Sequence, residues 1–178
     1  MQLAVLASAR FAGILIALTV PLAAQTTWYV DASAPGPGTG TQADPFTQIQ
    51  SGIGAASSGD TVLVLPGTYV ETIDFLGRDV HVQSSQGPAA TVIDGNGSGT
   101  VVTFANGETQ AAVLEGFTVT NGTGAPGTAG TAANPTGGRG HPGGIACTNA
   151  SPSVRDCVVT LNRGGAGGGG YFSLGLWS

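Results

Sequence analysis

Short apolar and β-branched runs alternate with polar residues along most of the chain after residue 60, and turn signals separate them. Alternation with a period of two predicts half-buried strands, while Pro-Gly and Asn-Gly pairs predict tight turns. The runs cover residues 61–65, 80–83, 101–104, 117–120, 145–147 and 158–161. No helical periodicity interrupts them, so the pattern indicates either a solenoid of parallel strands or an antiparallel sandwich.

A repeat of residue types favours the solenoid. The stretches 72–75, 92–95, 113–116 and 154–157 each place a β-branched or apolar residue two positions before an acid, with steps of 20, 21 and 41 residues. A sandwich does not require the same residue types to recur about every 20 residues, whereas coils stacked on one another do. The longest step is then one coil plus an insertion, residues 122–144, whose Gly, Thr, Ala and Pro residues predict a loop leaving one corner.

A helix is expected before the first strands of the stack. Asp44 is placed to cap it and Pro45 to occupy its first position, where a missing N–H costs nothing. Apolar residues follow at helical spacing as far as Gly59. One apolar face on so short a helix predicts a lid over the first coil, with residues 25–59 forming an N-terminal cap.

The first 24 residues carry one charge, Arg10, and an apolar run from Phe11 to Val20. This run is short for a membrane span, and small residues follow it, so we expect a cleaved signal peptide and an exported product with no membrane span. The chain has no lysine and a formal charge of −5, with its few arginines scattered. A clustered basic face is therefore absent, which argues against nucleic-acid binding.

Two cysteines, Cys147 and Cys157, lie ten residues apart. In an exported chain they could form a disulfide, or each could be a small buried hydrophobe at an inward position. With no neighbouring His or Cys they make a weak zinc site.

Several motifs resemble a known group of proteins. The stretches 28–31, 44–46, 59–62 and 66–69 are similar to the N-terminal region of bacterial secreted proteins of the right-handed parallel β-helix, pectate-lyase-like superfamily, and 143–147 and 151–157 are similar to its repeats. The resemblance implies an all-β, right-handed parallel β-helix over residues 60–178. It does not select an activity, because lyases, epimerases, hydrolases and proteins without catalysis share this fold.

The four repeated acids, Asp74, Asp94, Glu115 and Asp156, are the main candidate site. If they stack at the strand spacing of about 4.8 Å, their repulsion would favour a Ca²⁺ ion between coils. Alternatively, they lie at a solvated corner and serve as turn residues.

Other candidate groups are few. Catalysis of a lyase type would need a base and a cation, for which only Arg78, Arg155, His81 and His141 are available, and nothing in the sequence brings any two together. His81 should point outward, and His141 lies with Arg139 in the glycine-rich segment. Candidates for stacking on sugars are Tyr69, Tyr171 and Trp177, whereas Trp28 and Tyr29 are expected to pack in the cap.

These observations lead to two hypotheses. The first is a secreted, non-catalytic scaffold or glycan-contacting surface protein. The second is the N-terminal part of a longer polysaccharide lyase, epimerase or hydrolase, because the pattern leaves the last coil unfinished and without a polar cap. The interior of the coils is expected to contain Val62, Val64, Ile73, Val80, Val82, Ile93, Val102, Phe104, Leu114, Phe117, Val119, Ile145, Val154 and Val159.

Overall fold

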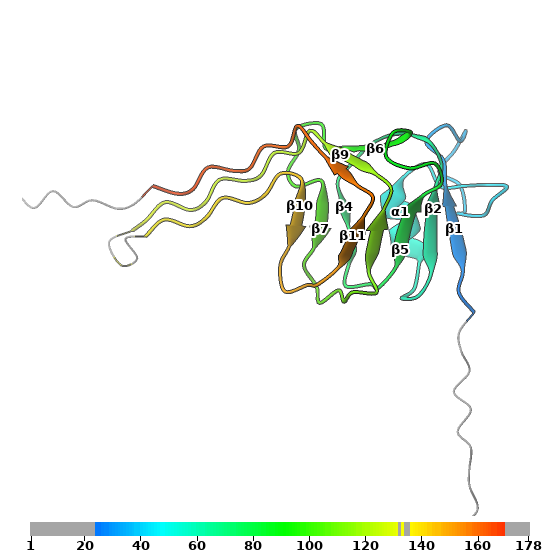
Figure 1. The fold of residues 1–178 in the computed structure, drawn as a ribbon, viewed down its shortest axis with the longest axis horizontal. Helices are drawn as coiled ribbons and strands as arrows, with labels where there is room; N and C mark the ends of the chain where they lie inside the picture. Colours follow the sequence, from blue (N-terminus) through cyan, green and yellow to red (C-terminus); the bar gives the residue numbers. More distant parts are fainter. Residues whose placement is uncertain (1–23, 132, 134–135, 170–178) are drawn as a thin grey trace, which may run out of the picture.

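The computed structural model describes residues 24–131, 133 and 136–169 (Figure 1). The expected signal peptide, apart from Ala24, and the candidates Tyr171 and Trp177 lie outside the described residues. The described part is almost entirely β. Its elements are β1 (Thr27–Val30), α1 (Ile49–Ala55), β2 (Thr61–Val64), β3 (Gly67–Val70), β4 (Ile73–Asp74), β5 (His81–Ser84), β6 (Thr91–Asp94), β7 (Val102–Phe104), β8 (Val113–Glu115), β9 (Thr118–Thr120), β10 (Ile145–Cys147), β11 (Ser153–Arg155) and β12 (Val158–Val159).

The strands form three sheets, and every strand pairing within them is parallel. The orders are β1-β2-β5-β8-β11 in the five-stranded sheet, β3-β6-β9-β12 in the four-stranded sheet and β4-β7-β10 in the three-stranded sheet. From β2 onward the chain visits the five-, four- and three-stranded sheets in turn, and it does so three times before β11 and β12 begin a fourth round (Figure 1). The described residues are therefore mostly β with parallel sheets, which is compatible with the expected all-β or solenoid-like fold and differs from the antiparallel pairing of a sandwich.

The core lies between the three sheets and is built from alternate strand positions. In β2 and β5, Val62 and Val82 are fully buried and paired in register, and Leu114 continues the same row in β8. Phe75 and Phe104 pack with ring centroids 4.2 Å apart and ring planes tilted by 36°. Eleven of the fourteen expected interior residues are buried, because the strand alternation was assigned to the correct face.

The remaining three interior positions belong to the last round of strands. Val154 and Val159 pair with the fully buried Leu114 and Val119, yet they are 41% and 51% exposed. Ile145 is half-buried. Their register is therefore as expected, but no further strand of the described residues covers them.

The expected helix start was wrong. The helix α1 begins at Ile49, four residues after Pro45, because the Asp44 carboxylate accepts a hydrogen bond from the Thr39 hydroxyl and holds a turn instead. Phe46 then bridges to Val30 along the edge of β1. The helix packs on the first strands, since Ile49 and Ile53 are buried and α1 contacts β1, β2 and β4.

Glu71, from the turn after β3, caps the helix in place of Asp44. Its two carboxylate oxygens accept the backbone N–H groups of Ile49 (2.8 Å) and Gln50 (3.0 Å), two donors that the first turn leaves without helical partners. Burial raises the pKa of Glu71, although these two hydrogen bonds act in the opposite direction.

The repeat of acids was aligned wrongly. The stretch 72–75 belongs to the three-stranded sheet, 92–95 to the four-stranded sheet, and 113–116 and 154–157 to the five-stranded sheet. Within the last pair Glu115 lies beside Arg155, one position away from the assumed match. Each round turns three corners, so similar corner sequences about 20 residues apart can come from different sheets.

The glycine-rich insertion does leave one corner, between β9 and β10, but it is an ordered arm rather than an irregular loop. Three extended segments, 122–131, 136–144 and 163–169, lie side by side and project from the sheets (Figure 1). We call these three segments the arm. Gly124, Gly127 and Gly130 donate their N–H groups to the carbonyls of residues 163, 166 and 169, so the hydrogen bonds recur every third residue.

The same period of three governs packing inside the arm. A Cβ atom added to Gly124, Gly140 or Gly168 would come within 1.8–1.9 Å of a carbonyl oxygen in a neighbouring segment. Three residues per turn is the repeat of polyproline II, and where three such chains pack around a common axis only glycine fits at that axis. The arm is thus held together by backbone contacts.

Candidate functional site

The acidic column does not form. Asp74 and Asp94 each accept the backbone N–H two residues ahead, from Leu76 (2.7 Å) and Asn96 (2.8 Å), so both carboxylates hold turns. Asp156 lies in a left-handed turn with φ of 49°. Among the residues that the structure describes, no three His, Cys, Asp or Glu side chains come together as metal ligands would. The expected calcium site therefore has no carboxylate cluster behind it in this part of the chain.

Asp60 also serves the fold. It accepts hydrogen bonds from the backbone N–H groups of Ser57 (2.9 Å) and Thr26 (2.8 Å) and from Trp28 Nε1 (3.2 Å), which ties the cap to the start of β2. These backbone donors lower the pKa of Asp60, and they outweigh the opposite effect of burial. Asp60 therefore stays ionised and fully engaged.

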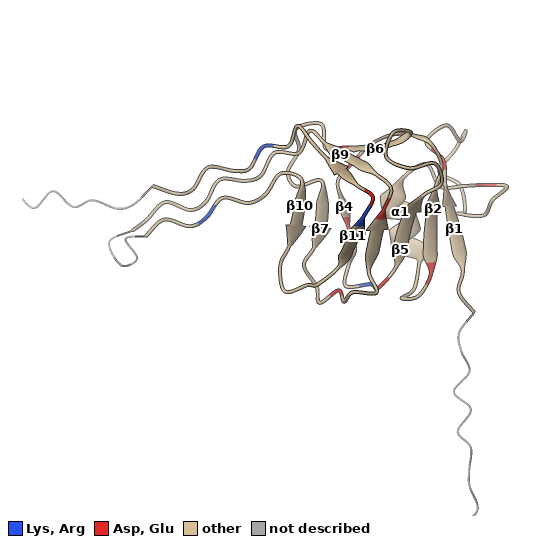
Figure 2. Ribbon diagram, in the orientation of Figure 1, with Lys and Arg blue, Asp and Glu red and all other residues tan. Residues whose placement is uncertain are grey.

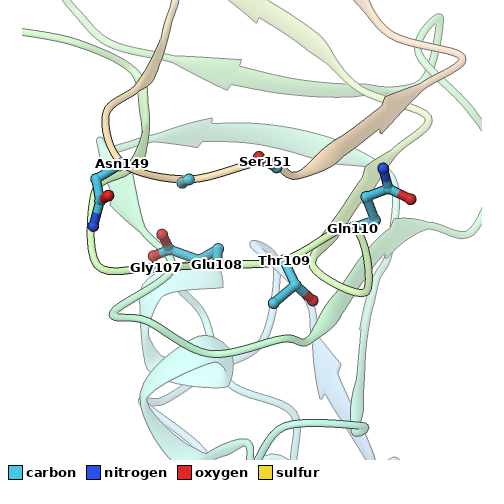
Figure 3. Close-up of a pocket in the computed structure, with 7 residues that line it drawn as sticks. Gly107, Glu108, Thr109, Gln110, Asn149 and Ser151 are labelled. Carbon is cyan, nitrogen blue, oxygen red and sulfur yellow. The ribbon is translucent and has the colours of Figure 1, made fainter.

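One surface hollow lies beside Glu108, at the corner between β7 and β8 (Figure 3). Residues 107–110 and 149–151 line it. Glu108 is 2% exposed, and its carboxylate accepts N–H groups from Gly77 (2.8 Å) and Asn106 (2.9 Å). Burial alone would raise its pKa, but the backbone donors together lower it. Because both oxygens are occupied, this hollow offers no free carboxylate for chemistry.

The outer face of the five-stranded sheet carries a different arrangement. One row of outward positions crosses the strands in register and contains Tyr29, Leu63, Gln83, Glu115 and Arg155. The next row places His81 between Thr61 and Val113. We call the first set the Tyr29–Arg155 row. Parallel strands are about 4.8 Å apart, so this row spans roughly 19 Å across the strands.

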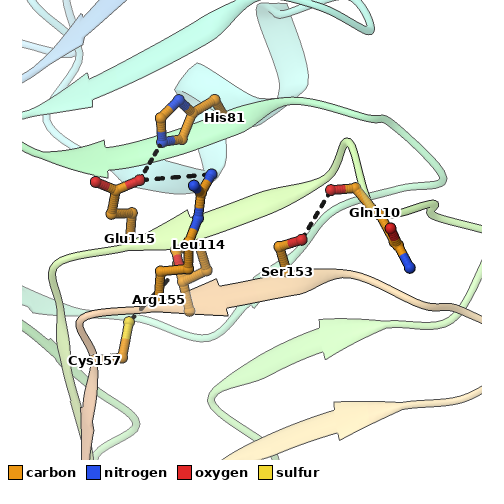
Figure 4. A network of polar contacts seen from close by, with 7 residues as sticks. All are labelled: His81, Gln110, Leu114, Glu115, Ser153, Arg155 and Cys157. Carbon is orange, nitrogen blue, oxygen red and sulfur yellow. Dashed lines mark hydrogen bonds and ion pairs between the residues drawn. The ribbon is translucent and has the colours of Figure 1, made fainter.

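Three charged or polar side chains meet on this face (Figure 4). His81 Nε2 lies 3.0 Å from Glu115 Oε2, and an Arg155 guanidinium nitrogen lies 3.8 Å from the same oxygen. The exposed fractions are 31% for His81, 26% for Glu115 and 57% for Arg155. All three can therefore be reached from solvent, and Arg155 is the most open of them.

Sequence reasoning missed this cluster, although it considered His81 and Arg155 separately. The outward orientation of His81 was correct. The missing step was to align residues 81–83 with 113–115 and 153–155, which puts Glu115 next to Arg155 and two residues along from the partner of His81. The expected acidic column had instead aligned Glu115 with Asp94 and Asp156.

The aromatic candidates differ in burial and in the direction that they face. Tyr69 is 2% exposed, and its hydroxyl donates to the Leu65 carbonyl (2.8 Å), so it cannot stack on a ligand; burial raises its pKa to about 12. Trp28 packs in the cap against Phe46, as expected. Tyr29 differs from the expectation, because the register puts it in the outward row.

The remaining sequence candidates lie apart from this face. Arg78 donates to the Ile53 and Gly54 carbonyls at the end of α1 and is a structural residue. Arg139 and His141 lie in the arm. Cys147 and Cys157 are free thiols in this structure, and burial raises the pKa of each.

In comparisons with known proteins, no protein-family model, curated protein or solved structure matched this chain significantly. The one helix within the described residues, α1, has seven residues. No helix in this part of the chain is long and apolar enough to cross a membrane.

Proposed function

We propose that this chain is an exported, right-handed parallel β-helix that contacts a glycan through the outer face of its five-stranded sheet without cleaving it. The observation that carries the proposal is the Tyr29–Arg155 row. It offers an aromatic ring, an apolar side chain, an amide, a carboxylate and a guanidinium at regular strand spacing.

This chemistry suits an extended sugar polymer lying across the strands. Tyr29 can stack on the apolar face of a sugar ring, while Gln83, Glu115 and Arg155 can donate to or accept from hydroxyl groups. Because the row follows the stacking direction of the coils, successive sugars would meet successive strands. A rigid sheet also keeps these groups in place before the ligand arrives, which lowers the entropic cost of binding.

Binding rather than cleavage is supported by the state of Glu115. It is the cluster's one carboxylate, and its Oε2 already contacts His81 and Arg155. Hydrolysis of a glycosidic bond commonly uses two carboxyl groups, one on each side of the bond. Two other acids, Asp60 and Asp79, line a hollow together with His81. Asp60 accepts hydrogen bonds from the N–H groups of Ser57 and Thr26, and Asp79 accepts hydrogen bonds from the N–H and hydroxyl groups of Thr109.

The proposal is tested by measuring glycan binding of the purified chain on a polysaccharide panel, by affinity electrophoresis and calorimetry. We expect Tyr29→Ala and Arg155→Gln each to weaken binding about tenfold, as loss of a well-placed contact of about 1.4 kcal/mol would. Val70→Ala, at an exposed position of the four-stranded sheet, is the control and should bind like the parent.

Two results would contradict the proposal. The first is that no polysaccharide binds, or that Tyr29→Ala and Arg155→Gln bind as tightly as the parent. The second is turnover: release of unsaturated products from a uronate polysaccharide, followed by the rise in ultraviolet absorbance with and without Ca²⁺, would show that the chain is a lyase.

A further inference from the structure

The last strands of the three sheets, β10, β11 and β12, form an apolar end face. Each has a partner strand on one side only among the described residues. The inward positions of these strands and of the turn between β11 and β12 are Ile145, Cys147, Val154, Cys157 and Val159. Val154, Val159 and Cys147 are exposed. Unpaired edges beside exposed apolar side chains favour pairing with another set of strands.

The opposite end of the stack is closed. There the helix α1 packs its buried Ile49 and Ile53 against β1, β2 and β4. A second copy therefore cannot place its first round of strands on the open end of the first copy. If two copies meet through their end faces, they must meet tail to tail, which gives a closed two-fold dimer and not a fibre.

The arm adds an electrostatic reason for a second copy to be the partner. It leaves the corner beside the end face and extends beyond that face (Figure 1). It contains Arg139 and Arg163 and no acid, a formal charge of +2. All ten acids of the chain lie in the rest of the described structure against two arginines, Arg78 and Arg155, a formal charge of −8 (Figure 2).

We propose that the end face of residues 145–159 is the interface of a symmetric, tail-to-tail dimer in which each arm lies along the acidic sheets of the other copy. The apolar inward positions supply the buried centre of the interface. The arm and the partner's carboxylates supply complementary charge at its edge, which steers association and depends on salt. The dimer interface uses inward positions such as Val154, whereas the Tyr29–Arg155 row uses outward positions; the two surfaces meet at β11, which carries both Val154 and Arg155.

The test is the molar mass of the full chain in solution, measured by light scattering and sedimentation over a range of concentrations and at low and high salt. We expect a dimer whose dissociation constant rises with salt. Val159→Lys should raise that constant about tenfold or more, because it places an unpaired charge in the interface. Val70→Lys is the matched control: Val70 is 63% exposed on the first strand of the same sheet, and this variant should dimerise normally.

Two further measurements separate the parts of the proposal. Arg139→Glu should weaken the dimer, whereas Arg139→Lys, which keeps the charge, should not. The Cys147 thiol should react with a maleimide in the monomer and be protected as the dimer forms. Three results would overturn the proposal: a monomer at every concentration and salt, a dimer that Val159→Lys leaves unchanged, or a monomer whose Cys147 is protected by another segment of its own chain.

Discussion

The body of stacked strands and the arm are stabilised by different kinds of contact. In the body, side chains alternate with a period of two, and residues such as Leu114 and Phe104 are fully buried between sheets. In the arm, contacts recur with a period of three, and glycine lies where the segments meet. The body gains stability from burial of apolar area, whereas the arm gains it from backbone hydrogen bonds that become available when side chains are absent.

The largest loss of unfolding free energy is expected from a substitution in the core of the body. Phe104→Ala removes a fully buried ring that packs on Phe75, and it should lower the free energy of unfolding by about 3–5 kcal/mol. Chemical denaturation followed by circular dichroism measures this. Val159→Ala, at an inward position that is half-exposed in the single chain, should cost under about 1.5 kcal/mol at concentrations where the chain is monomeric. Similar losses for both variants in the monomer would mean that Val159 is buried within the single chain.

A smaller loss of unfolding free energy is expected from Asp60→Asn, because the amide nitrogen of asparagine would face at least one of three N–H donors. The loss should be about 1–3 kcal/mol at neutral pH. The pKa of Asp60 in the folded chain lies below its ordinary value of 3.8, so its contribution is complete above that pH and is lost as the pH falls through the lower, folded value. Unfolding curves between pH 7 and pH 2 should therefore converge for parent and variant, and a gap that widens in acid would contradict the assignment.

The arm should respond to substitution without a comparable change in the body. Gly168→Ala places a Cβ atom 1.8 Å from the Thr128 carbonyl oxygen, so the segments must separate. Gly167→Ala, one residue earlier, places its Cβ atom 4.0 Å from the Gly138 carbonyl oxygen and serves as the control. We expect limited proteolysis to cut the arm faster in the first variant alone, while the unfolding midpoint of the body stays unchanged. Equal cleavage of both variants would show that the segments are not packed on glycine.

The smallest effect is expected on the outer face. Arg155→Gln removes a 3.8 Å ion pair between partly exposed groups, so the free energy of unfolding should fall by no more than about 1 kcal/mol. Denaturation and glycan binding measured on the same sample then separate the two roles of Arg155. A loss of several kcal/mol would identify it as a structural residue.

The strands of the body could be predicted from the sequence, because apolar and polar residues alternate along each strand. Val62, Val82 and Leu114 are apolar residues of this pattern that are buried as expected. It misplaced the helix start, since Glu71, more than twenty residues away, caps α1 in place of Asp44. It also misaligned the acids, because rounds of unequal length put Asp74, Asp94 and Glu115 on three different sheets. Local patterns identify strands, but the lateral neighbours of Glu115 depend on how many residues each corner contains.

The arm was predicted as a loop because its composition has no apolar pattern. The information was present as spacing: Gly124, Gly127 and Gly130 in one segment, Gly137, Gly140 and Gly143 in the next, and Gly165 and Gly168 in the third. A search for periods of two and 3.6 residues cannot detect a period of three. Segment pairing also joins residues 122–144 to 163–169, a long-range contact that composition does not encode.

Amide hydrogen exchange of the full chain, read residue by residue by NMR, tests the contrast between body and arm most directly. The amides of Gly124, Gly127 and Gly130 donate to the neighbouring segment, whereas those of Ala125 and Ala129 donate no backbone hydrogen bond among the described residues. We predict slow exchange at every third residue of the arm, beside continuous protection in inner strands such as β5 and β8. Uniformly fast exchange from residue 122 to residue 131 would contradict the account, because the arm would then be an unstructured loop.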